Sequence, residues 1–77
     1  MIEKSHLIKI ANMPMPFGKY KNKVLIDLPE DYLLWLAQKG FPRGELGDLL
    51  SLVLVIKTEG VEGVVNPLRS KYPYKRQ

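Results

Sequence analysis

A long apolar segment in the second half of the chain gives the clearest structural signal. Residues 45–59 place apolar side chains at helical spacing, with acids at the start, Lys57 near the end and Gly60 directly after. Acids in the first turn and a base in the last turn interact favourably with the helix dipole. Glycine readily takes the left-handed conformation that ends a helix. The pattern predicts a helix over residues 45–59.

A second helix is predicted just before it. Pro29 suits the first helical position because its missing N–H would be unpaired there, and two acids follow in the first turn. Gly40 ends this segment as a typical left-handed cap. Tyr32 and Trp35 lie three residues apart on it and share a face, and we expect them to pack in the core.

The N-terminal third predicts a short helix and a β-hairpin. Ser5 is a plausible N-cap for a helix over residues 6–11. Residues 24–27 form a β-branched and apolar run, which is the clearest prediction of a strand in the chain. Residues 18–23, the lysine loop, would form the turn of the hairpin, with Asn22 in a left-handed conformation.

These elements predict a small α+β domain with a short β-hairpin and two or three helices, of which the last long helix is strongly apolar. A chain of 77 residues is long enough for one domain only. We place this domain at residues 1–66. Residues 67–77 contain two prolines and four basic residues, and we expect a flexible basic tail there.

The long helix is apolar on nearly every side, which bears on the oligomeric state. Leu52, Leu54 and Val55 lie off its main apolar face. A helix that is apolar on both sides must be covered on both sides, and soluble monomers seldom expose a large apolar patch. We therefore expect these three residues to form a homodimer interface. The alternative is a helix enclosed by its own monomer.

The net charge of +4 is concentrated at the two ends of the chain. Residues 1–23 carry five lysines against one glutamate, and residues 60–77 carry four basic residues against one glutamate. Residues 24–59 carry six acids against three bases. Basic clusters attract phosphate backbones without reading sequence, although they also serve simply to keep a surface soluble.

The lysine loop carries the most suggestive chemistry. Lys19, Lys21 and Lys23 alternate with Tyr20, so an extended chain would place the lysines on one face and the tyrosine on the other. Lysines contact phosphates, and an adjacent aromatic ring can stack on an unpaired base. We expect these four residues to bind single-stranded nucleic acid or nucleic-acid ends. The alternative is that Tyr20 packs on the core and the lysines protect an edge strand.

The C-terminal segment would add unspecific positive charge to this site. Its candidate residues are Arg69, Lys71, Lys75 and Arg76.

No arrangement in the sequence indicates an enzyme, a metal site or a cofactor. Glu30 and Asp31 stabilise a helix start, which leaves Asp27 as the third member of a weak carboxylate cluster. There is no cysteine, and His6 alone cannot hold zinc. No signal peptide and no apolar run of about 20 residues is present, so we expect a cytoplasmic protein that does not enter the membrane.

Several motifs follow one another in a characteristic order. They are Met15-Pro16-Phe17-Gly18-Lys19-Tyr20-Lys21, Leu25-Ile26-Asp27-Leu28-Pro29, Tyr32-Leu33 with Trp35, Gly40-Phe41-Pro42 and Leu46-Gly47. In these motifs the chain resembles short bacterial proteins catalogued as putative quorum-sensing-regulated virulence factors, over roughly residues 5–69. The label implies regulation and names no activity.

A shorter stretch, residues 17–35, is similar to the small C-terminal module of some bacterial exonucleases of the proofreading type. In that module a Phe-Gly-Lys-x-Lys-Gly run precedes a Leu-Pro-x-x-Tyr-Leu-x-Trp helix. The matching residues are Phe17, Gly18, Lys19, Lys21, Leu28, Pro29, Tyr32 and Trp35. The resemblance implies an accessory role in handling nucleic acid. Asn22 stands where glycine is usual, and without the nuclease domain any activity would need a partner.

Overall fold

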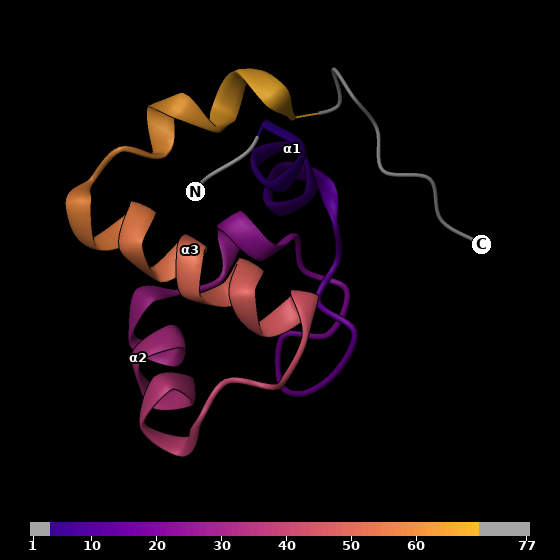
Figure 1. Ribbon diagram of the computed structural model, residues 1–77, viewed down its shortest axis with the longest axis vertical. Helices are drawn as coiled ribbons and strands as arrows, with labels where there is room; N and C mark the ends of the chain where they lie inside the picture. The colour runs from indigo at the N-terminus through magenta and orange to yellow at the C-terminus, as the bar shows by residue number, and fades with distance from the viewer. Residues whose placement is uncertain (1–3, 70–77) are drawn as a thin grey trace.

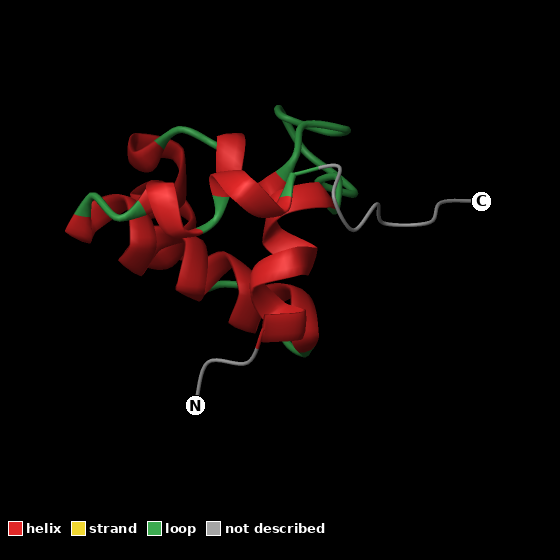
Figure 2. Ribbon diagram, turned by 90° about the horizontal axis from the view of Figure 1, so that it is seen from above, coloured by secondary structure: helices red, strands yellow, loops and turns green. Residues whose placement is uncertain are grey.

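A computed structural model of the chain describes residues 4–69, and every regular element in that range is a helix (Figure 1, Figure 2). The α-helices are α1 (Lys4–Asn12), α2 (Glu30–Lys39) and α3 (Glu45–Glu59), and the 3₁₀ helices are η1 (Leu25–Asp27), η2 (Glu62–Val64) and η3 (Asn66–Leu68). Because no strand occurs between residues 4 and 69, the expectation of an α+β fold is wrong.

The error lies in residues 24–27, which do not form a strand. Leu25 to Asp27 is the 3₁₀ helix η1, and Val24 forms only an isolated antiparallel bridge with Pro14. Leu25, Ile26 and Leu28 are all buried, whereas a strand would turn alternate side chains to opposite faces. Periodicity alone cannot distinguish a short apolar strand from a short buried helix, and here contacts with α1 and α3 determine the result.

The lysine loop nevertheless reverses the chain, as a hairpin turn would. The Met15 N–H donates to the Lys23 carbonyl at 2.8 Å, and the Asn22 N–H donates to the Met15 carbonyl at 2.7 Å. Asn22 has a φ of 75°, so its predicted left-handed conformation is confirmed. Pro14 and Pro16 have no N–H to donate, which helps to explain why the pairing does not extend into a ladder.

The three α-helices agree well with the sequence pattern. α3 spans the predicted residues and ends at Gly60, whose φ of 71° is left-handed. α2 ends at Gly40, whose N–H donates to the Leu36 carbonyl at 2.8 Å. α1 includes Ser5, so the prediction that Ser5 precedes the helix as its N-cap is wrong. Local signals therefore define most of the helical structure.

The core forms where α3 packs against α1, η1 and α2. Its fully buried large side chains are Ile10, Met15, Leu25, Ile26, Leu28, Leu33, Leu49, Leu50, Val53 and Val65. Burying one such side chain contributes about 1.5–3 kcal/mol. None of the helices within residues 4–69 is long and apolar enough to cross a membrane.

The chain after α3 returns to α1, so that η2 and η3 lie at one end of the molecule (Figure 1). The Asn12 side-chain amide donates to the Leu68 carbonyl at 3.0 Å. Arg69 donates two hydrogen bonds to the Asp27 carboxylate, at 2.5 and 3.1 Å. These bonds attach residues 68 and 69 to α1 and η1.

Candidate functional site

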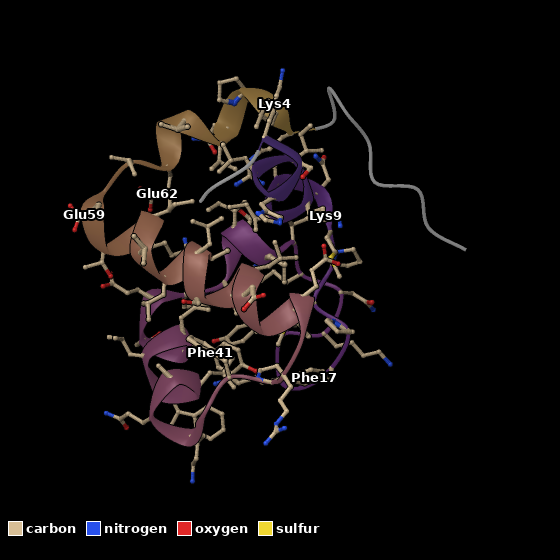
Figure 3. The ribbon with its side chains drawn as sticks, in the orientation of Figure 1. Lys4, Lys9, Phe17, Phe41, Glu59 and Glu62 are labelled. Carbon is tan, nitrogen blue, oxygen red and sulfur yellow. The ribbon has the colours of Figure 1, made fainter. Side chains whose placement is uncertain are left out.

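An open pocket lies between the lysine loop and α2, and we call it the aromatic pocket. Its volume is about 550 Å³, which falls within the range of about 300–1,000 Å³ common for ligand sites. It is lined by Phe17, Gly18, Lys19 and Tyr20 on one side and by Asp31, Tyr32, Trp35 and Leu36 of α2 on the other. Phe17 lies at the opposite end of the molecule from Lys4 (Figure 3).

Three aromatic rings form a continuous row along this pocket. The rings of Tyr20 and Tyr32 are 4.7 Å apart between centroids and meet edge to face at 72°. The rings of Tyr32 and Trp35 are 5.9 Å apart and stacked, with 23° between their planes. Trp35 is 51% exposed, so the expectation that it packs in the core is wrong. The buried face of α2 is instead formed by Leu33 and Leu36.

Gly18 allows the lysine loop to approach this row closely. Its φ of 84° is left-handed, and a Cβ built there would lie only 3.0 Å from the Tyr32 hydroxyl oxygen. A larger residue would be strained in this conformation and would press on Tyr32. The glycine therefore helps to set the width of the aromatic pocket.

Lysine ammonium groups lie beside two of the rings. The Nζ atom of Lys19 is 5.5 Å from the centroid of Tyr20, and that of Lys39 is 5.7 Å from the centroid of Trp35. Both distances are within the range of cation–π attraction, about 6 Å. The aromatic surface is thus bordered by positive charge at both ends.

The predicted nucleic-acid residues of the lysine loop are only partly brought together. Lys19, Lys21 and Lys23 are exposed, and Lys19 alone of the three lines the pocket. Tyr20 is half-buried, because its ring packs against Tyr32 and the edge of the core. The packing of Tyr20 on the core agrees with the alternative drawn from the sequence, although residues 4–69 contain no edge strand for the lysines to protect. Tyr20 also borders the pocket, and its stacking on a base stays a prediction.

Arg69 does not join this site, because its guanidinium is bound to Asp27. The hydrogen bonds from Arg69 hold the pKa of the Asp27 carboxyl below its ordinary value, although partial burial opposes them. Lys23 adds a weaker electrostatic contribution of the same sign. The remaining tail candidates lie outside the described residues: Lys71, Lys75 and Arg76.

The residues expected in a dimer interface have unequal exposure. Leu52 and Leu54 are half-buried and pack against the core of their own chain. Val55 is 53% exposed. Val61 and Val64, which follow shortly after α3, are also exposed, at 44% and 59%. The dimer itself stays a prediction.

The sequence names Lys19 and Tyr20 as binding residues but does not predict the pocket that α2 completes, although a signal for the α2 side is present. Asp31, Trp35 and Lys39 recur every four residues along α2, a spacing that places side chains on one helix face. Phe17 gives no such signal, because its place in the pocket depends on the fold. Within residues 4–69, no three His, Cys, Asp or Glu side chains come together in a way that could hold a metal ion.

Comparison with known proteins identifies relatives along nearly the whole chain. Residues 3–68 match the family described as putative quorum-sensing-regulated virulence factor. The chain is 59% identical over 69 residues to the uncharacterized protein YpeB of Escherichia coli K12, with 88% of this chain and 96% of the relative covered. The YpeB protein of Escherichia coli O157:H7 gives the same values.

No solved structure matches the chain. Neither the family description nor the names of the relatives give a catalytic activity. These matches do not concern the proofreading exonucleases, so the similarity of residues 17–35 to their C-terminal module stays a prediction.

Proposed function

The chain belongs to the putative quorum-sensing-regulated virulence factor family, and we propose that it binds single-stranded nucleic acid through the aromatic pocket and the lysine loop. The observation that carries this proposal is the position of Trp35, which is half exposed in a pocket bordered by lysines. A small domain gains most by burying its large aromatic side chains. A solvent-exposed tryptophan beside positively charged side chains is suited to bind a flat, anionic ligand.

Bases and phosphates would contact different parts of this surface. Stacking of a base on an aromatic side chain contributes about 1–3 kcal/mol and does not depend strongly on base identity. Lys19, Lys21 and Lys23 would contact the phosphates that flank the stacked base. Lys39 has a flexible side chain, so its ammonium could move from the Trp35 ring to a phosphate when a base takes its place.

A duplex groove is a poorer match for this surface than an unpaired strand. Reading a groove usually requires a basic helix that enters it. α2, the helix that lines the pocket, begins with acids and contains more acids than bases. The basic helix α1 does not line the pocket. An unpaired strand needs only stacking surfaces and nearby positive charge.

Proline-rich peptides are the competing class of ligand, because they also bind grooves lined by aromatic side chains. The charge of the surface argues against them. Lys19 and Lys39 lie beside the rings, and Lys21 and Lys23 are exposed in the lysine loop. This excess of positive charge favours a polyanion.

The single tryptophan of the chain provides a direct test. Because Trp35 lines the pocket, a base that stacks on it should quench its fluorescence. We expect short single strands to quench it at about 50 mM salt, and duplexes of the same length to bind more weakly. The apparent log affinity should fall with log salt at a slope near −2, since each neutralised phosphate contributes about −0.7 for single strands.

Replacing Lys19, Lys21 and Lys23 together by glutamine should remove most of the binding and most of the salt slope. Lys57→Gln is the control, because this lysine lies in the last turn of α3 and does not line the pocket. Absence of binding at about 50 mM salt, or unchanged binding by the triple variant, would contradict the proposal. Quenching by a proline-rich peptide alone would assign the pocket to peptides instead.

A dimeric scaffold is the second candidate, and it is favoured by the exposure of Val55, Val61 and Val64. In this proposal a second copy of the chain covers these valines, and nucleic acid has no role. Light scattering at micromolar concentration should then give close to twice the chain mass of 8.8 kDa. A monomer at about 100 µM would exclude this candidate without affecting the first, because the valines do not line the aromatic pocket.

A further inference from the structure

An acidic side chain lies in the aromatic pocket, which is unexpected at a site for a polyanion. Among the described residues that line the pocket, Asp31 is the only acid, and it is exposed in the first turn of α2. A carboxylate repels phosphates and can only accept hydrogen bonds. In a single strand the N–H donors belong to the bases, so a carboxylate at this point is suited to contact a base edge.

We infer that Asp31 makes the aromatic pocket selective for guanine, an inference that rests on the proposed binding of single-stranded nucleic acid. Guanine presents two adjacent donors, N1–H and N2–H, on its Watson–Crick edge, and they match the two oxygens of a carboxylate. Adenine and cytosine present one amino group beside a ring-nitrogen acceptor. Thymine and uracil present one N–H between two carbonyl oxygens, which repel a carboxylate.

The backbone of α2 places the carboxylate and the stacking ring together. Asp31 and Trp35 are four residues apart in α2, so they lie on one face of the helix about one turn apart. A base stacked on the Trp35 ring can therefore direct one edge towards Asp31. Asp31 is the only carboxylate among the described residues of the pocket, so no other carboxylate there accepts hydrogen bonds from the base. Lys39 continues the same row by another four residues and is available to the phosphate.

The Asp31 carboxylate is also held in position. The backbone N–H of Tyr32 donates to its Oδ1 atom at 2.7 Å. A carboxylate has about four acceptor positions on its two oxygens, so this bond leaves acceptor capacity on both atoms. An ordered carboxylate discriminates better than a mobile one, because less entropy is lost when the base binds.

The probes are a short oligothymidylate and three variants with one central guanine, adenine or cytosine, with fluorescence of Trp35 as the readout. A single guanine keeps the strand from forming structures of its own. The guanine probe should bind about tenfold more tightly than the all-thymine probe, since a good bidentate contact is worth about that much or more. The adenine and cytosine probes should fall between them.

Asp31→Asn should reduce the preference for guanine over thymine to within about twofold, whereas affinity for the all-thymine probe should stay the same or rise because a repulsive charge is gone. Glu30→Gln is the matched control. It removes a negative charge from the same helical turn but does not line the pocket, so it should keep the guanine preference. A role of Asp31 only in stabilising the helix start predicts that the two variants behave alike.

Failure of this inference differs from failure of the proposed function. Equal binding of all four probes by the wild-type chain, or a guanine preference that survives in Asp31→Asn, would overturn the role of Asp31 and leave single-strand binding in place. Absence of binding to every probe would overturn both. Circular dichroism of the two variants before and after heating shows whether each is folded during the comparison.

Discussion

At the scale of single residues, Trp35 differs from the buried side chains of α2 in its exposure. It is 51% exposed, whereas Leu33 on the same helix is fully buried. The half-exposed ring stacks with Tyr32 and lies beside Lys39, and Trp35 itself does not belong to the core cluster. Trp35 should therefore matter more for binding than for stability.

Trp35→Ala should lower the free energy of unfolding by only about 1 kcal/mol, the amount that an aromatic pair contributes. Leu33→Ala should lower it by about 2–5 kcal/mol, because it opens a cavity in the core. Binding of a labelled single strand, followed by anisotropy, should weaken about tenfold or more in Trp35→Ala. Equal destabilisation of the two variants in urea would show instead that Trp35 is a core residue.

At the scale of elements, the start of α3 lies close against the loop that connects it to α2. Gly47 is buried in α3, and a Cβ added there would lie 1.8 Å from the carbonyl oxygen of Pro42. Such a distance cannot be accommodated without movement of the backbone. The glycine therefore allows the backbone of the loop at Pro42 to approach α3 closely.

Gly47→Ala should destabilise the protein by about 1–3 kcal/mol, the usual cost of overpacking, although alanine favours helices over glycine by about 0.5–1 kcal/mol. Gly63→Ala is the control, because nothing lies within 4 Å of a Cβ built there. It should change the free energy of unfolding by less than about 0.5 kcal/mol. Thermal unfolding of both variants checks the difference, and a stabilising effect of Gly47→Ala would mean that the loop moves away easily.

At the scale of the whole molecule, the pair of Arg69 and Asp27 connects the last described residue to η1. The two hydrogen bonds from Arg69 keep the pKa of Asp27 lowered in the folded chain. A lowered carboxyl pKa stabilises the fold above the pKa of the unfolded chain, about 3.9. The contribution is lost as the pH falls below that value and through the lower pKa of the folded chain.

Arg69→Gln should cost about 0.5–1 kcal/mol at pH 7, since both side chains are partly exposed. The difference between this variant and the wild-type chain should shrink when urea unfolding is repeated well below the ordinary aspartate pKa. Glu45, whose pKa is lowered by its hydrogen bond with Lys9, is present in both proteins and cancels from the comparison. A difference that stays the same at low pH would contradict the role of Asp27.

The fold and the pocket also differ in how much the sequence could predict. The limits of α3 and the C-terminal end of α2 followed from acids, bases and glycines within a few residues of each helix end, and such signals are local. The turn in the lysine loop is predicted by signals of the same local kind. The expected sheet failed at residues 24–27, because an apolar run does not specify on which sides it will be covered.

The sequence by itself determined the three α-helices, the reversal at Asn22 and the basic character of the lysine loop, because each depends on neighbours in the chain. Only the tertiary structure decided that residues 25–27 form a 3₁₀ helix in contact with α1 and α3. The same holds for the contact between Tyr20 and Tyr32 at the aromatic pocket. The tertiary structure also decided that Arg69 binds Asp27, far from it in sequence. These outcomes depend on contacts between segments that are distant in the sequence, and local sequence patterns do not specify such contacts.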